Sequence, residues 1–325
     1  MKNMKCNYCD SADNKVLFGW MRYEKNNILQ CNNCGLVFQE IRASKKEIEV
    51  FYKKEYRKIK TLPILTAEQH YNSKVSKKDA FDRTQFILRN IGLNGKKILE
   101  IGSASGGLLE KMRNADSEVE GIELNDDFRL HSQKLGFNIF NRPIEELNFK
   151  ETYDIIVSFM TIEHFIDPKS AFKSIFSALK PNGLFLGEVP NQNDWRISIF
   201  NNEIIKRLHY DPNHYYYFST ETLKNYLETC GFSKIIFETI ERYNSLIQLR
   251  YILCNRNSGK NIARELDKHI FPDSEKDDVR LPHSDDQVEH EFNRIFERAV
   301  NYELKGNCIR FVALKRILST LEEEA

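Results

Sequence analysis

The stretch ILEIGSASGGLLEKM, residues 98–112, runs from apolar residues through a glycine-rich turn into a segment with helical periodicity. A strand, a glycine-rich turn and a helix in this order open the doubly wound α/β sheets. In such sheets the turn presents backbone N–H groups at a helix N-terminus, where ligands bind. The stretch therefore predicts a strand–turn–helix unit with a ligand at the turn.

The residue types around this turn restrict the ligand. A dinucleotide-binding turn would place glycines at positions 102, 104 and 107, and the middle position here is Ala104. Glu100 precedes the turn, and its carboxylate would repel a nearby pyrophosphate. Glu123 ends the next strand, where an acid can accept hydrogen bonds from both ribose hydroxyls. These acids favour a cationic nucleoside, and S-adenosylmethionine carries an ammonium and a sulfonium but no phosphate.

Strands and helices alternate after this unit, which predicts a parallel sheet covered on both faces. Before it, DAFDRTQFILRNIG predicts a helix with Phe81, Phe86 and Leu88 near one face. The segment at 193–210 looks like one helix. The predicted strands after the first are EVEGIEL (118–124), FNIFNRP (137–143), YDIIVSFMTI (153–162), LFLGEVPN (184–191), SKIIFETI (233–240) and CIRFVALKR (308–316).

This pattern resembles the class I S-adenosylmethionine-dependent methyltransferases over about residues 81–240. EIGSASGG matches their first motif, VEGIEL their ribose strand, RPIEELNF the segment beside the adenine, and YDIIVSFMTIEHFIDP their fourth strand. The resemblance implies a Rossmann-like α/β fold with a seven-stranded sheet. Asn141-Arg142 stands where the family often has an aspartate, so the adenine contact falls to the backbone near Ile144 and Glu145. The expected cofactor-binding residues are Glu100, Gly102, Ser103, Gly106, Glu123, Leu124, Ile144 and Glu145.

Two CxxC pairs near the start predict a structural zinc site. They are Cys6–Cys9 and Cys31–Cys34, and Gly35 after the second pair suits the turn that closes a zinc knuckle. A bound metal would explain how about 40 residues fold without a sizeable core. Four thiolates leave no open coordination position, which argues against a catalytic role.

Two histidine segments are candidates for the chemistry. Glu163-His164 follows the fourth strand, and His164 could take a proton from a hydroxyl or only shape the cofactor pocket. HYDPNHYYYFS, residues 209–219, resembles the HxxYFS segment of zinc-containing methyltransferases that modify nucleotide-bound deoxysugars. That resemblance implies His214 as base and Tyr216 as a lining residue of the sugar site. Tyr215 and Tyr217 could instead pack the edge of the sheet, and Asn191, Gln192 and Asp194 could bind substrate or form a polar loop.

Asn213-His214 replaces the Glu-His pair of the carbon-methylating members, which favours methylation of an oxygen on a sugar or another small polar acceptor. The 48 basic and 47 acidic residues give a formal charge of +1, which disfavours nucleic acid as a partner. An enzyme acting on ribosomal RNA and a non-catalytic scaffold that binds a protein stay open as alternatives. The oligomeric state also stays open.

No long apolar run or signal-peptide core is present, so we expect a cytoplasmic protein without a membrane partner. The polar stretch 255–286 reads as a loop, and Cys230, Cys254 and Cys308 read as buried small side chains. The expected units are a zinc ribbon (1–42), a helical connector (43–80), the methyltransferase domain (81–244) and a mainly helical C-terminal appendage (245–325).

Overall fold

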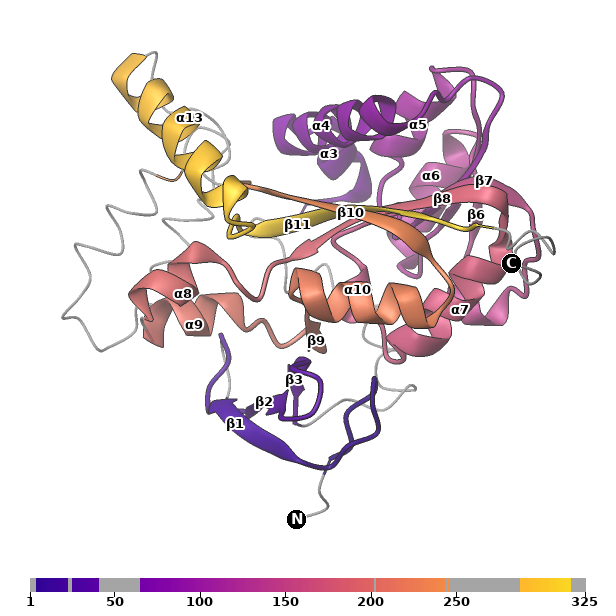
Figure 1. Cartoon of the computed structure of the whole chain (residues 1–325). Helices are drawn as coiled ribbons and strands as arrows, with labels where there is room; N and C mark the ends of the chain where they lie inside the picture. Colours follow the sequence, from indigo (N-terminus) through magenta and orange to yellow (C-terminus); the bar gives the residue numbers. More distant parts are fainter. Residues whose placement is uncertain are drawn as a thin grey trace, which may run out of the picture.

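The computed structural model describes residues 4–22, 25–40, 65–201, 203–242, 245 and 287–316. Its centre is a seven-stranded sheet in the order β10-β11-β8-β7-β4-β5-β6 (Figure 1). The strands of this sheet are β4 (Lys97–Ile101), β5 (Glu118–Ile122), β6 (Asn138–Phe140), β7 (Tyr153–Phe159), β8 (Leu179–Pro190), β10 (Ser233–Ile240) and β11 (Cys308–Leu314). The α/β fold and the seven strands predicted from the sequence are confirmed.

The sheet is mixed rather than wholly parallel. Six of the seven strands run in the same direction, whereas β11 lies antiparallel between β8 and β10. The segment that follows residue 245 in the chain thus returns to supply an internal strand, from Cys308 to Leu314. The expected boundary at residue 244 therefore does not separate an appendage from the sheet.

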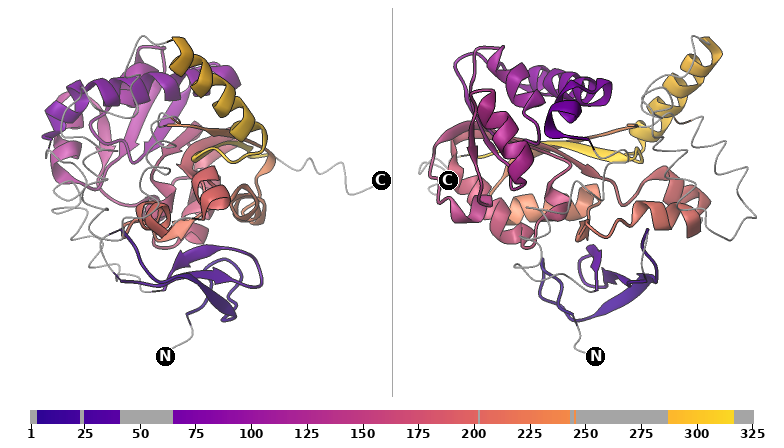
Figure 2. Two further views of the ribbon diagram at one scale, coloured as in Figure 1. Left: turned by 90° about the vertical axis from the view of Figure 1, so that its left-hand side faces the viewer. Right: turned by 180° about the vertical axis from the view of Figure 1, so that it is seen from behind.

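Helices cover both faces of the sheet (Figures 1 and 2). On one face α4 (Lys74–Asn90) and α5 (Gly107–Arg113) pack over apolar side chains of β4, β7 and β8. On the other face lie α7 (Pro168–Ala178) and α10 (Thr220–Thr229). The described helical set also contains α3 (Ala67–Asn72), α6 (Asp126–Lys134), η1 (Ile144–Glu146), η2 (Ile162–His164), α8 (Trp195–Phe200), α9 (Glu203–His209) and α13 (Gln287–Tyr302).

Two helix predictions need correction. In α4 the buried side chains are Ala80, Thr84, Phe86 and Ile87, whereas Phe81 is 55% and Leu88 44% exposed. Of the three predicted residues, Phe86 lies on the buried face and the other two do not, because small and polar residues contribute much of that face. The single helix predicted at 193–210 is divided into α8 and α9 at Asn201, whose φ is +47°.

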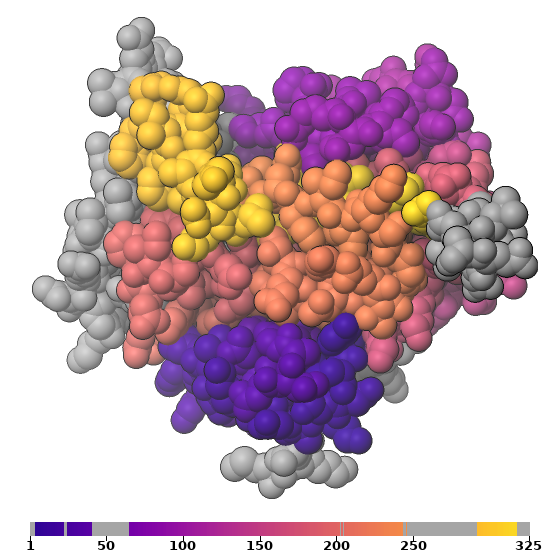
Figure 3. Space-filling model, in the orientation of Figure 1, coloured from indigo at the N-terminus to yellow at the C-terminus, as the bar shows by residue number. Residues whose placement is uncertain are grey.

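The cysteine module forms a second, four-stranded sheet in the order β1-β2-β3-β9. Its own strands are β1 (Asn14–Phe18), β2 (Ile28–Cys31) and β3 (Val37–Gln39). The fourth, β9 (Tyr216–Tyr217), lies between α9 and α10 in the chain and pairs with β3. Figure 3 shows the module seated directly against this part of the molecule. The cysteine module and the segment before α10 therefore share one sheet.

Several sequence predictions fall outside the described residues, namely most of the helical connector, the loop at 255–286 and Cys254. The helix predicted at 287–305 is present as α13. Cys230 and Cys308 are buried, as predicted. Among the described residues, no helix has the length and apolar character needed to cross a membrane.

Candidate functional site

The glycine turn after β4 needs residues without a side chain. Gly102 has a φ of +82°, and a Cβ there would lie 2.9 Å from Cγ2 of Thr161 and closer still to its hydroxyl. Gly106 has a φ of +86° and caps the N-terminus of α5. The loop after β7 thus lies directly against the glycine turn, which joins the two candidate sites.

Glu123 holds the turn from the second strand. Its carboxylate accepts hydrogen bonds from the backbone N–H groups of Ala104 (2.9 Å) and Asn125 (2.8 Å). Ala104 has a φ of +45°, a conformation that costs about 1 kcal/mol or more for a residue with a side chain. The hydrogen bond from Ala104 to Glu123 offsets this strain. It also fixes the Glu123 carboxylate at the end of β5, where the sequence predicts a contact with the ribose.

Glu100 lies at the end of β4 and is only 4% exposed. Burial raises the pKa of its carboxyl to about 8, against the opposing effect of the Arg83 charge, while Glu123 raises it further. Its Oε2 has no hydrogen-bond partner in the described part of the chain. A buried, unpartnered carboxyl oxygen at a ligand turn is well suited to accept hydrogen bonds from an ammonium group.

Arg83 extends this site from α4. Among the described residues, its guanidinium has no hydrogen-bond partner, and it lies 3.9 Å from a carboxylate oxygen of Glu188 and over the Phe159 ring. Its donors are thus available for an anionic group near Glu100. The sequence analysis did not single out Arg83, because nothing in a helix before the first strand indicates which side chain reaches the turn.

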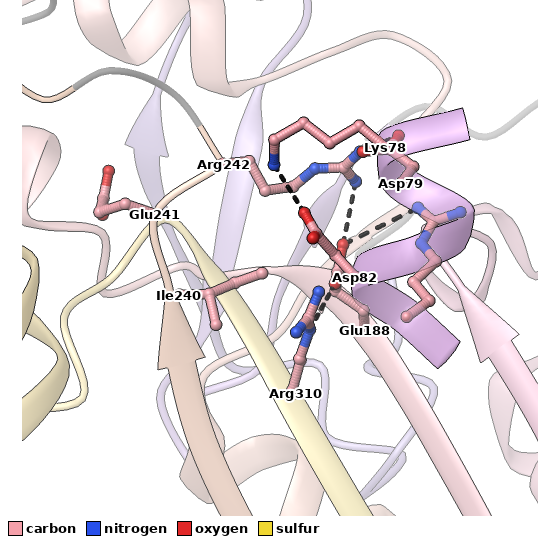
Figure 4. A pocket seen from close by; sticks show the side chains of 9 residues that line it. Lys78, Asp79, Asp82, Glu188, Ile240, Glu241, Arg242 and Arg310 are labelled. Carbon is pink, nitrogen blue, oxygen red and sulfur yellow. Dashed lines mark hydrogen bonds and ion pairs between the residues drawn. The ribbon is translucent and has the colours of Figure 1, made fainter. Parts of the chain in front are cut away.

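Arg83 is one of the residues that line a polar pocket. Figure 4 labels the other side chains of this pocket. At its base Glu188, 1% exposed, accepts hydrogen bonds from Arg242 (2.9 Å) and Arg310 (2.8 Å). Although burial opposes ionisation, the guanidiniums of Arg242, Arg83 and Arg310 hold the pKa of Glu188 below its usual value. Arg242 also pairs with Asp79. With Lys78, Asp82 and Glu241, four basic and four acidic side chains line the pocket, so its formal charges balance.

The other predicted cofactor residues lie around the same turn. Ser103 is buried against Gly121, and Leu124 follows Glu123 at the end of β5. Ile144 points into the core from η1, so a ligand contact there would use the backbone of Ile144 or Glu145. These positions stay predictions for the cofactor site.

A buried cluster of Glu163, His164 and His214 follows β7. The Nε2 atoms of His164 and His214 lie 3.9 and 4.0 Å from Oε1 of Glu163, and the two rings contact edge to face at 4.9 Å between centroids. Glu163 and His164 lie on η2, whereas His214 comes from the loop before β9. The structure therefore brings the two predicted histidines together and adds Glu163, which the sequence presented only as the neighbour of His164.

The hydrogen bonds of His164 define its tautomer. Its Nδ1 lies 2.7 Å from the carbonyl oxygen of Asn213, which can only accept, so the proton is on Nδ1. When neutral, His164 therefore presents a lone pair on Nε2, on the side of Glu163. The arrangement can accept a proton and stabilise the resulting imidazolium. One nitrogen of each histidine and a carboxylate oxygen could also hold a divalent metal, since the three lie within 4.8 Å of one another.

The tyrosines after His214 take structural places. Tyr216 is fully buried and donates its hydroxyl to the carbonyl oxygen of Ile166 at 3.1 Å. Tyr217 donates to the carbonyl oxygen of Asp211 at 3.0 Å. Tyr215 is 5% exposed, and burial raises the pKa of its phenol to about 12. The hydrogen bond from Tyr216 to Ile166 therefore stabilises the segment that follows His164. A role for Tyr216 in lining the sugar site stays a prediction.

The polar side chains after β8 also have internal partners. Asn191 donates to the carbonyl oxygens of Leu304 and Gly306, and Asp194 caps α8 and pairs with Arg196. Gln192 donates to the hydroxyl of Tyr210 at 3.1 Å. These contacts favour the polar-loop interpretation for Asn191 and Asp194.

The four cysteines of the two CxxC pairs converge. The Sγ atoms of Cys6 and Cys34, and those of Cys9 and Cys31, are 3.5 Å apart, and all four lie within 4.8 Å of one another. These separations are too long for a disulfide bond and suit four thiolates around one tetrahedral ion. The donor set therefore fits zinc.

Comparison with known proteins places the middle of the chain in a family. Residues 71–235, about half of the chain, match the family described as methyltransferase domain. Among curated proteins, the ubiquinone biosynthesis O-methyltransferase of Pseudomonas fluorescens is 31% identical over 121 residues, which cover 34% of this chain and 51% of that protein. The protein of the same name from Erwinia tasmaniensis is 28% identical over 170 residues, 49% of this chain and 67% of its own. The chain thus spans about half the length of the first of these relatives.

A solved structure also aligns with part of the chain. An S-adenosylmethionine-dependent methyltransferase from Archaeoglobus fulgidus aligns with a TM-score of 0.49 and 17% identity. The alignment covers 74% of this chain and 95% of that one.

Proposed function

Because the chain belongs to the methyltransferase-domain family, we propose that it transfers the methyl group of S-adenosylmethionine to a hydroxyl of a small polar acceptor. The observation that carries this proposal is the buried cluster of Glu163, His164 and His214 beside the glycine turn. A hydroxyl must lose its proton when it attacks the methyl carbon, and these histidines can accept one.

The protein binds the methyl donor through three of its parts: the methionine ammonium, the methionine carboxylate and the ribose hydroxyls. Glu100 accepts hydrogen bonds from the methionine ammonium, and Arg83 donates to the methionine carboxylate. Glu123 accepts from the ribose hydroxyls while it keeps its contact with Ala104. Opposite charges at Glu100 and Arg83 match the zwitterionic end of the cofactor, which supports this orientation over the reverse one.

Methyl transfer is then an in-line displacement. The acceptor oxygen bonds to the methyl carbon as the carbon–sulfur bond breaks, and S-adenosylhomocysteine leaves. The hydroxyl proton passes to Nε2 of His214 or His164, and Glu163 stabilises the imidazolium. Most of the acceleration comes from alignment of oxygen, carbon and sulfur, with proton removal contributing about 10²–10⁴-fold.

We propose a sugar or nucleotide sugar, in glycan or natural-product biosynthesis, as the acceptor. Two features support this class: the HYYYFS segment and the four-cysteine module, which pair through β9 and β3. The names of the curated relatives favour a second candidate, a hydroxyl of a ubiquinone precursor. Both candidates are oxygen acceptors and use the same base.

We also propose that the four cysteines bind one structural zinc ion. Cys6, Cys9, Cys31 and Cys34 supply the complete coordination shell, and the metal stabilises the short strands of the module. Metal analysis of the purified protein should give one zinc per chain. Two metals per chain would indicate that the histidine cluster also binds one.

A two-step experiment tests the function. Calorimetry should first show binding of S-adenosylmethionine, and its absence at millimolar ligand would contradict the enzyme proposal. Labelled methyl donor is then offered to nucleotide sugars, cell-surface glycans and aromatic hydroxyl compounds. Transfer to the first two groups supports the sugar proposal, and transfer only to the aromatic compounds supports the second candidate. Transfer to RNA instead, weakening steeply with salt, would overturn both.

A further inference from the structure

A single glutamine of the cysteine module reaches the loop that carries His214. Gln39 ends β3, and its side chain is almost completely buried at 2% exposure. Its Nε2 lies 2.8 Å from the carbonyl oxygens of both Pro212 and His214 and 3.4 Å from that of Asp211. One amide group thus holds three carbonyls of a four-residue loop.

The loop 211–214 has further contacts with the cysteine module and within itself. On the module side, Arg22 pairs with Asp211 at 3.4 Å, and the backbone N–H of Gln39 donates to the carbonyl of Tyr215. Within the loop, the Asp211 carboxylate accepts from the backbone N–H of Asn213 at 2.9 Å. The Asp211 carboxylate thus stabilises the conformation of the loop, and contacts from the cysteine module fix the position of the loop.

The loop also forms one wall of the catalytic cluster. Asn213 accepts the hydrogen bond that defines the tautomer of His164, and the backbone N–H of Tyr215 donates to the carbonyl of Glu163. Any displacement of the loop would therefore move His214 relative to Glu163 and also change the orientation of His164.

We propose that Gln39 is a positioning residue, which fixes the loop 211–214 and so holds His214 beside Glu163 and His164. The cysteine module then completes the acceptor site rather than forming an independent domain. A primary amide is suited to this task because its two N–H groups can bridge two carbonyl oxygens. The inference rests on the proposed function for the role of His214, but the geometry of the loop can be tested without an acceptor.

The test compares Gln39→Met with Gln30→Met in the full-length, metal-loaded protein with S-adenosylhomocysteine. Methionine keeps the length of glutamine and removes the amide. Gln30 is the matched control, because it lies on β2 of the same module and donates only to the Gly35 carbonyl at 3.4 Å. The ring resonances of the eight histidines are recorded by NMR, and His214→Gln identifies the His214 signal.

We expect the His214 and His164 signals to move and broaden in Gln39→Met and to stay in place in Gln30→Met. Zinc content and cofactor affinity should match the wild type in both. With an acceptor from the screen, Gln39→Met should lower kcat by about 10-fold or more, since small misplacements of a catalytic group have effects of this order. Absence of turnover with every acceptor would contradict the proposed function and leave the NMR comparison valid.

Unchanged histidine signals in Gln39→Met, or equal changes in both variants, would overturn the inference. If Gln39→Met does not fold, Tyr217→Phe provides the second test. It removes the hydroxyl that donates to the Asp211 carbonyl and retains the ring. A movement of the His214 signal that Gln30→Met does not show supports the inference, and an unchanged signal contradicts it.

Discussion

The two halves of the site are held in different ways. The proposed donor half takes Glu100, Gly102 and Glu123 from 24 residues on and after the neighbouring parallel strands β4 and β5, and α4 adds Arg83. The acceptor half joins η2, the loop before β9 and the cysteine module, and its contact between Gln39 and His214 spans 175 residues of sequence. The donor half thus depends on local backbone conformation, whereas the acceptor half depends on the docking of one sheet against another.

The largest effect should come from the acceptor half. His214→Gln removes a nitrogen that can accept a proton, so we expect methyl transfer to fall by about 10²–10⁴-fold. The affinity for S-adenosylmethionine should stay within about 2-fold, because the donor contacts are made elsewhere. Single-turnover kinetics and calorimetry measure the two quantities.

His209→Gln is the matched control for this variant, because His209 lies at the end of α9, next to the same loop but outside the cluster. It should retain most of the activity. Equal losses in the two variants, or a loss of donor binding in His214→Gln, would contradict the separation of the halves.

The next largest effect should come from the donor half. In Gly102→Ala the new Cβ meets Thr161 and the φ of +82° becomes strained, which costs about 1–3 kcal/mol before the clash is counted. We expect donor affinity to fall by about 10- to 100-fold, measured by calorimetry.

Gly107→Ala adds a methyl group five residues later, where neither a positive φ nor a close contact constrains the residue. Its Cβ would come no closer than 3.6 Å to Ser76 Oγ, and alanine favours a helix. Donor affinity and thermal stability should match the wild type. A comparable loss at Gly107 would mean that crowding at this turn, rather than the conformation of Gly102, limits binding.

The contrast between the halves also explains what the sequence could predict. The glycine turn and its acids are contiguous or lie one βα unit apart, so their spacing indicated the donor site directly. Arg83 and Gln39 carried no such pattern, because their roles arise from packing between distant segments. The place of β11 was equally hidden, since strand order depends on contacts between β8, β10 and a segment beginning at Cys308. Phe81 and Leu88 misled the prediction because helical spacing cannot distinguish a buried face from apolar residues exposed to solvent.

Removal of zinc should weaken the acceptor half selectively. A chelator, or the double variant Cys31→Ser with Cys34→Ser, should destabilise the cysteine module. The hydrogen bonds from Gln39 to the loop 211–214 should weaken as a result. We expect kcat to fall by about 10-fold or more, with donor affinity changed by less than about 2-fold. Calorimetry and turnover before and after re-addition of zinc provide the measurement. A parallel loss of donor binding would show that the two halves share one support.

The smallest effect concerns the release of a proton from Glu100 when the donor binds. Because burial raises its pKa to about 8, the unliganded carboxyl is mostly protonated at pH 7. The unfolded carboxyl ionises near 4.5, so this group lowers the stability of the fold as pH rises from about 4.5 to about 8. Binding of an ammonium favours the ionised form. The donor should therefore bind more tightly as pH rises from about 6 to about 7.5.

Calorimetry in two buffers of different ionisation enthalpy measures the protons released. At pH 7 the wild type should release about 0.9 proton per donor bound, since a group with pKa near 8 is about nine-tenths protonated there. Glu100→Gln should release almost none and lose the pH dependence, whereas Glu118→Gln, at an exposed position on β5, should match the wild type. Equal release from Glu100→Gln and the wild type would place the proton elsewhere and remove Glu100 from the ammonium site. The proposed donor half would then rest on its turn, Glu123 and Arg83.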